Sequence, residues 1–177
     1  MLNEIELKDI AVILSGLVTA VSTLSAVFIT SYFNHKLSKS SLEREVEHKK
    51  VERKIEKLEE FYLLFEKWEV NFSNVYLLHY RCYKGKLDYS QVLESTSKPS
   101  LLLPGEAQKL LMLLNVHLQE LIDEYKLVDK ARSELVPFLC DPSERDLSAD
   151  KFCEKQQSFE SVCQEFKKKV CTLASKL

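Results

Sequence analysis

Glycine and proline are scarce in this chain, which has three glycines and four prolines among its 177 residues. Both residues are unfavourable inside a helix, so their scarcity leaves long stretches in which a helix can form without interruption. The chain also lacks the glycine-rich loop that cradles phosphate groups, and no alternation of apolar and polar residues marks a strand. We therefore predict an all-α fold.

Sequence motifs of catalysis and metal binding are absent as well. The chain has no HExxH helix, no GxSxG turn and no cluster of cysteine and histidine at metal-ligand spacing. His79 and Cys82 share one predicted helical face, but two candidate ligands make only half of a zinc site. The arginine-to-histidine spacing of all-helical HEPN ribonucleases is also missing. We predict that the protein is not an enzyme and has neither a cofactor nor a metal site.

The cysteines do not define a disulfide framework, because they are odd in number and form no CxxC pair. They lie within apolar helical patterns, which is typical of free thiols that pack as small hydrophobic groups in a reducing compartment. These residues are Cys82, Cys140, Cys153, Cys163 and Cys171.

The charge balance argues against nucleic-acid binding. The net charge is −2, and basic and acidic residues are equal in number after the first nine residues. A nucleic-acid-binding surface normally shows a basic excess or a basic stripe with aromatic residues. The one tight basic run, at residues 167–169, lies near the end of a predicted helix, where cations complement the helix dipole.

One stretch lacks charge altogether: no Asp, Glu, Lys or Arg lies between Asp9 and His35, although 29% of the chain is charged. At about 1.5 Å per residue, a helix over residues 10–34 is long enough to cross a hydrocarbon core roughly 30 Å thick. A buried core helix usually has shorter apolar runs, and a cleaved signal peptide does not begin with acidic residues. We predict a transmembrane helix over residues 10–34.

Basic residues flank this run asymmetrically, since only Lys8 precedes it and a series of lysines and arginines follows over residues 36–54. Lysine and arginine mark the cytoplasmic side of a membrane protein. Residues 1–9 are therefore expected to be a short extracytoplasmic N-terminus, and everything after residue 34 is expected in the cytoplasm, at a bacterial inner membrane. Residues 35–54 are mostly charged and have no continuous apolar stripe, which predicts a charged juxtamembrane stalk.

Three apolar patterns predict long helices in the remaining residues, 55–177. In the first, apolar side chains recur from Val51 at alternating steps of four and three, interrupted only by Glu69. The second is expected from about residue 106 to 135, where Pro137 stops it, and the third from an N-cap at Ser148 to the end of the chain. The residues expected in the core are Phe65, Phe72, Leu114, Leu118, Leu121, Phe159, Cys163 and Phe166.

A short helix is expected between the first two long helices. Gly85 is typical of a helix C-cap, and Asp88 with Gln91 matches a capping box that opens a helix to about residue 94. Residues 95–105 are rich in serine and proline and are expected to be a connector. Short connections favour antiparallel neighbours, so the prediction is a cytoplasmic up-down-up bundle of three long helices plus one short helix.

The predicted transmembrane helix carries a stripe of small and weakly polar side chains at steps of four and three. Lipid tails give helices no hydrophobic drive to associate, so close approach through small residues and hydroxyl contacts takes that role. The stripe suggests a homo-oligomer; alternatively, each hydroxyl bonds its own helix backbone. The residues of this association seam are Ser15, Thr19, Ser22, Ala26 and Thr30.

In outline the chain resembles a loose group of uncharacterised bacterial single-pass membrane proteins with a cytoplasmic helical domain. The resemblance rests on a serine- and threonine-containing span that ends in the polar-aromatic motif TSYFNHKL at residues 30–37, followed by a charged helix. Some members of that group are linked to phage defence or other mobile elements.

The C-terminal Ser175-Lys176-Leu177 matches a peroxisomal address, which we interpret as a coincidence because a membrane span does not suit that import route.

Two classes of function are consistent with these features. In the first, the bundle is an interaction module held at the inner membrane as a scaffold, a sensor or a partner subunit. In the second, the protein assembles into an oligomer that perturbs the membrane or forms a pore. The expected partners are the lipid bilayer, further copies of the chain and an unidentified cytoplasmic protein.

Overall fold

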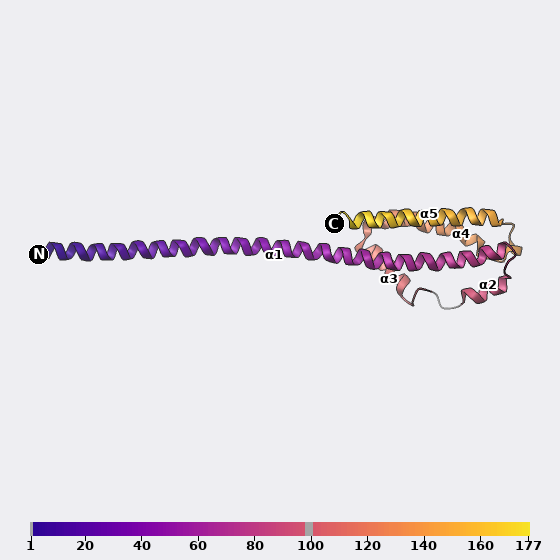
Figure 1. Cartoon of the computed structure of the whole chain (residues 1–177), viewed down its shortest axis with the longest axis horizontal. Helices are drawn as coiled ribbons and strands as arrows, with labels where there is room; N and C mark the ends of the chain where they lie inside the picture. The colour runs from indigo at the N-terminus through magenta and orange to yellow at the C-terminus, as the bar shows by residue number, and fades with distance from the viewer. Residues whose placement is uncertain (1, 98–100) are drawn as a thin grey trace. The chain divides into compact units, whose positions relative to one another are not determined.

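The computed structural model describes the backbone of residues 2–97 and 101–177, and the side chains within those ranges from residue 9 onward. These ranges contain five α-helices and no strand, so the prediction of an all-α fold is confirmed. Two compact units share α1, one ending at Lys50 and the other comprising Val51–Leu177. The helices are α1 (Leu2–Tyr83), α2 (Tyr89–Thr96), α3 (Glu106–Met112), α4 (Ile122–Leu135) and α5 (Ala149–Ala174), as labelled in Figure 1.

The first unit consists of α1 up to Lys50, and every described side chain in it is exposed. The exposed fraction of the large apolar side chains before residue 34 ranges from 54% at Val21 to 75% at Phe28. This part of α1 is long and apolar enough to cross a membrane. The charge-free segment therefore forms the helix that its composition predicts, and nothing in its own unit covers it.

In the second unit, α5 lies along α1 in the opposite direction. The ring of Phe166, near the end of α5, contacts Phe61 of α1 at a centroid distance of 6.0 Å. At the other end of the same pair, Phe152 contacts Tyr80 at 6.1 Å. Residues early in α5 thus meet residues late in this part of α1, as expected for antiparallel neighbours (Figure 1).

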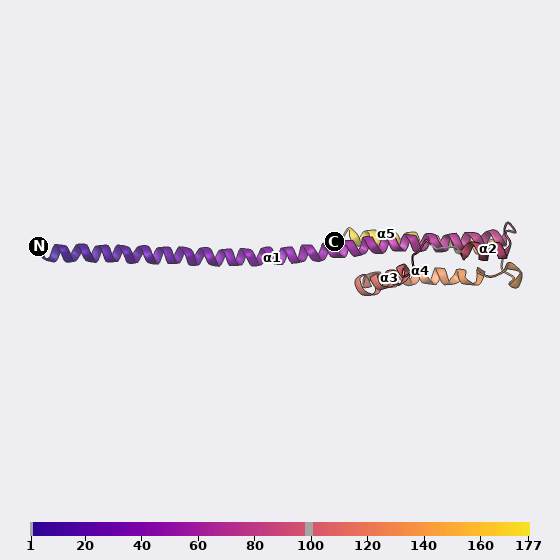
Figure 2. The same ribbon diagram turned by 90° about the horizontal axis from the view of Figure 1, so that it is seen from below.

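The expected continuous helix over residues 106–135 is wrong, because the chain reverses direction between α3 and α4. Glu106 of α3 lies beside Lys67, with Oε1 and Nζ 2.7 Å apart, and Lys109 pairs with Glu60, about two turns earlier in α1. After α3 come a π-helical turn (Leu113–His117) and a 3₁₀ turn (Gln119–Leu121). Helices α3 and α4 form a helical hairpin, and in Figure 2 both lie on the same side of α1.

Helix α4 then runs parallel to α1. Tyr125, near its start, lies 6.4 Å from Phe65 between ring centroids, and Arg132 lies over the Phe72 ring further along both helices. Relative to α1, helix α3 therefore runs antiparallel, α4 runs parallel and α5 runs antiparallel. The predicted up-down-up order of three long helices needs the same correction, because its middle helix is this α3–α4 hairpin.

The physical reason for the reversal lies in the leucines around it. Leu113 and Leu118 are five residues apart, so on a regular α-helix they would project about 140° apart and could not both face one core. The π-helical turn lets the Leu118 N–H donate to the carbonyl oxygen of Leu113 at 3.1 Å. Both side chains are then buried, with exposed fractions of 1% and 0%. Burial of both leucines favours the reversal over a straight helix.

Helix ends in the second unit follow the predicted capping residues. Gly85 has φ of 63° after the end of α1, a conformation that glycine adopts without steric cost. Asp88 and Gln91 form the predicted capping box of α2. The Ser148 hydroxyl accepts a hydrogen bond from the Lys151 N–H at 3.2 Å and caps α5. Part of the predicted 95–105 connector, residues 98–100, lies outside the described residues.

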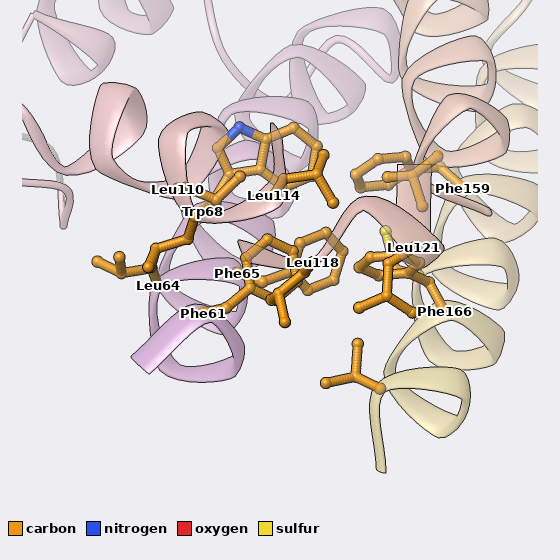
Figure 3. Packing of buried hydrophobic residues seen from close by; sticks show 14 of the residues in the cluster. Phe61, Leu64, Phe65, Trp68, Leu110, Leu114, Leu118, Leu121, Phe159 and Phe166 are labelled. Atoms are coloured by element: carbon orange, nitrogen blue, oxygen red, sulfur yellow. The ribbon is translucent and has the colours of Figure 1, made fainter. Parts of the chain in front are cut away.

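One apolar cluster joins α1, the hairpin and α5 in the second unit (Figure 3). Phe65 and Phe166 face each other across it with ring centroids 4.8 Å apart, and Leu118 lies among them with an exposed fraction of 0%. Phe61 is also fully buried, although the four-and-three spacing placed it off the apolar stripe. The buried face of α1 is therefore wider than a single stripe, as suits a helix with neighbours on two sides.

A charge placed in this core should destroy cooperative folding. In a fragment of residues 51–177, Phe159→Asp or Leu118→Asp would bury an unpaired carboxylate, so we expect neither variant to melt cooperatively in circular dichroism. Leu63→Asp is the matched control, because the Leu63 side chain is 61% exposed and tolerates a charge. Equal melting of all three variants would show that the core lies elsewhere.

Candidate functional site

The exposed apolar segment of α1 is the first candidate functional surface. Large side chains such as Leu24 and Phe28 are 70% and 75% exposed, and no charged residue interrupts them. A contiguous apolar surface of this length is unfavourable in water and marks a site of contact with a membrane or another apolar surface. Its helical geometry satisfies the backbone hydrogen bonds internally, which a hydrocarbon environment requires.

The predicted association seam lies on this segment, and its hydroxyl groups bond their own helix. Ser15 donates to the Val12 carbonyl oxygen at 2.9 Å, and Thr30 donates to that of Ala26 at 2.8 Å. Thr19 and Ser22 donate in the same way to residues one turn earlier. Hydrogen bonding of each hydroxyl to its own helix backbone was one of the two possibilities for this stripe, and it does not test whether the helices associate. With their hydrogens used in this way, the hydroxyls can only accept bonds from a neighbouring helix.

The predicted core residues lie together in the second unit, with one at its edge. Phe72 is partly buried and packs against Trp68, with ring centroids 4.8 Å apart. Burial raises the pKa of the Cys163 thiol to about 12, so it is not a reactive thiolate at neutral pH. The buried members are Phe65, Leu114, Leu118, Leu121, Phe159, Cys163 and Phe166.

Sequence reasoning missed a buried ion pair between α1 and α5. Lys167 Nζ lies 2.8 Å from Glu69 Oε2, and their side chains are only 12% and 9% exposed. Burial lowers the pKa of Lys167, but the carboxylate charges of Glu69 and Glu66 raise it, and the net pKa lies above its usual value. The available signal was Glu69, the one charge that interrupts the apolar pattern of α1. The pair links α5 to α1 in addition to their aromatic contacts.

Two apolar grooves flank Leu63 on the surface of the second unit. One, of about 370 Å³, lies between α1 and α5. The other, of about 520 Å³, lies between α1 and the α3 region and includes Leu101. Exposed apolar ridges next to grooves are typical of surfaces that receive a side chain of a partner protein. The first is lined by Leu58, Glu59, Tyr62, Leu63, Val170, Cys171 and Ala174.

Helix α2 covers a buried histidine of α1. His79 is 5% exposed, and its Nδ1 atom has no hydrogen-bond partner. Its ring lies 6.0 Å from that of Tyr89, the first residue of α2. Burial lowers the pKa of His79 below its ordinary value. The described residues therefore place this imidazole, in its neutral form, at the contact between two helices.

Within the described ranges, no group of three or more His, Cys, Asp or Glu side chains is arranged to hold a metal ion. His79 and Cys82 accordingly stay a pair without further ligands. The chain matches no family profile, no curated protein and no solved structure. The candidate surfaces of the described residues are the exposed apolar segment of α1, the grooves beside Leu63 and the contact of α2 with His79.

The buried ion pair gives a prediction of stability. Lys167→Met would leave the Glu69 carboxylate buried without its partner, so the free energy of unfolding of the 51–177 fragment should fall by about 3 kcal/mol in urea denaturation. The double variant Lys167→Met with Glu69→Leu should recover most of that loss. Lys155→Met is the matched control, because the Lys155–Glu134 pair is about 40% exposed on both sides and should contribute little. An equal loss in both lysine variants would contradict a special role for the buried pair.

Proposed function

We propose that the protein is a membrane-anchored, non-enzymatic helical interaction protein, which acts as a scaffold, a sensor or a partner subunit at a bacterial inner membrane. The observation that carries this proposal is the difference in burial between the two units. The apolar segment of α1 is fully exposed, whereas Val51–Leu177 has a core of its own. A span that needs lipid and a module that does not are what an anchored adaptor requires.

The grooves beside Leu63 support the interaction role of the second unit. Leu63 is 61% exposed, and Val70 and Leu77, which follow at seven-residue steps on the same helix face, are 48% and 49% exposed. An exposed apolar row of this kind suits an amphipathic helix of a partner, which would bury it by insertion of its own apolar side chains. We propose that a cytoplasmic partner protein binds this row.

The orientation in the membrane follows from the flanking charges. Basic residues concentrate after the apolar segment, so the N-terminus should face outward and Val51–Leu177 should face the cytoplasm. The resemblance to bacterial single-pass proteins with a cytoplasmic helical domain is consistent with the same orientation.

A reporter tests the orientation directly. A fusion that is active only in the cytoplasm, placed after Leu177, should be active in bacterial cells, and protease added outside sealed spheroplasts should leave the second unit intact. A reporter that requires export, placed at the same site, is the matched control and should be inactive. Digestion of the second unit in sealed spheroplasts would contradict the proposed topology.

A second candidate function is an oligomeric effector that perturbs or permeabilises the membrane, for example in phage defence. The stripe of small side chains at Ser15, Thr19, Ser22, Ala26 and Thr30 supports it, because such stripes allow close approach of helices in lipid. Self-association along this stripe is also compatible with the scaffold, so an oligomer alone does not distinguish the two functions.

Membrane potential distinguishes the two functions. We expect induction of the intact chain to leave growth and the signal of a potential-sensitive dye unchanged, as for the chain that lacks residues 1–34. Collapse of the potential by the intact chain, but not by the shortened one, would favour the pore-forming effector over the scaffold.

A further inference from the structure

Helix α2 is attached to the second unit by a small contact. Val92 is its one buried residue and is 0% exposed, whereas Leu93 beside it is 51% exposed. Tyr89 adds the ring contact with His79. Elements with few buried apolar contacts open with less free energy than the core does. Release of α2 can therefore occur while α1, the hairpin and α5 stay packed.

The group beneath α2 is one that resists protonation. A neutral imidazole has one N–H donor and one acceptor nitrogen, but an imidazolium has two donors that both need acceptors. The Nδ1 atom of His79 is buried and lacks a partner, so a proton there would be a desolvated charge with nothing to bind it. Protonation of His79 is therefore disfavoured while α2 covers the ring, and it becomes more favourable when the contact opens.

No neighbouring group offsets that charge. Within one turn of His79 on α1 the titratable side chains are Tyr76, Tyr80, Arg81, Cys82 and Tyr83; on α2 the ring of Tyr89 contacts His79, and Asp88 precedes Tyr89. Burial raises the pKa of the Cys82 thiol, and the carboxylates of Asp141 and Asp88 raise it further, so this thiol is neutral in mild acid. Among the described residues no carboxylate accepts a hydrogen bond from His79 Nδ1, and burial lowers the pKa of the ring.

We propose that His79 makes the α1–α2 contact an acid-sensitive latch, in which protonation of the imidazole releases α2 and uncovers Val92 and the His79 face of α1. The freed face would be an additional apolar surface on the second unit. The device is local, since the ion pairs elsewhere in the unit are formed by carboxylates that stay largely ionised at pH 5.

The direction of the pH dependence follows from proton binding. Burial lowers the pKa of His79 in the latched form, and release returns it to about its ordinary 6.5. The released form thus binds more protons, so the latch is fully stable above pH 6.5 and weakens as the pH falls below that value. The ratio of released to latched protein therefore rises between pH 7.5 and pH 5, by at most about 30-fold, the limit for a latched ring that takes up no proton.

A thiol at position 92 would report this release in the full-length chain. The experiment uses the detergent-solubilised protein with its five native cysteines replaced by alanine and with Val92→Cys added. The probe is 4,4′-dithiodipyridine, which reacts with thiols in mild acid, and rates are normalised to those of glutathione at each pH. We expect the normalised rate to rise severalfold, and by at most about 30-fold, from pH 7.5 to pH 5, while the fluorescence of Trp68 stays constant.

Two histidine variants decide whether His79 is responsible. His79→Phe keeps a packed ring without a titrating nitrogen and should reduce the rise to less than about threefold. His117→Phe is the matched control, because His117 is exposed, and it should keep the full rise. If His79→Phe loses helicity in circular dichroism, His79→Gln replaces it. A flat labelling rate in the parent, an undiminished rise in the His79 variant, or a parallel change of Trp68 fluorescence would overturn the latch.

Discussion

The contact between the aromatic faces of α1 and α5 is the interaction on which the rest of the second unit depends. Phe65 and Phe166 lie 4.8 Å apart between ring centroids, and Phe61 is fully buried beside them. The α3–α4 hairpin exists because its leucines complete this cluster, and the Glu69–Lys167 pair becomes buried where the two helices meet. Without that contact neither the reversal at Leu118 nor the desolvation of the ion pair would be stable.

Local patterns in the sequence were enough to predict the helical class and most helix ends. Asp88 and Ser148 cap the helices they were expected to cap, because capping depends on residues within one turn. The reversal between Leu113 and Leu121 was not predictable in that way. The pattern of leucines at positions 110, 114, 118 and 121 is what an uninterrupted amphipathic helix would show. The hairpin is favoured only by tertiary packing, which buries Leu113 together with Leu118.

The candidate functional surfaces also differ in how far the sequence alone predicts them. The exposed span is apparent from composition alone, because no charge occurs over a membrane-length run. In the predicted seam, Ser15 and Thr30 donate hydrogen bonds to backbone carbonyl oxygens of their own helix, and self-association along the seam stays a prediction. The burial of Glu69 and His79 required tertiary information, since a polar residue on an apolar stripe can equally lie at its exposed rim.

Membrane fractionation tests the central claim most directly: that the charge-free segment of α1 is an anchor for an independent helical module. The intact chain and a chain that begins at Val51 would be expressed in bacteria, and the membranes would be washed with alkaline carbonate. The account predicts that the intact chain stays in the washed bilayer and that the shortened chain is soluble and helical. Release of the intact chain by the wash, or retention of both chains, would contradict it.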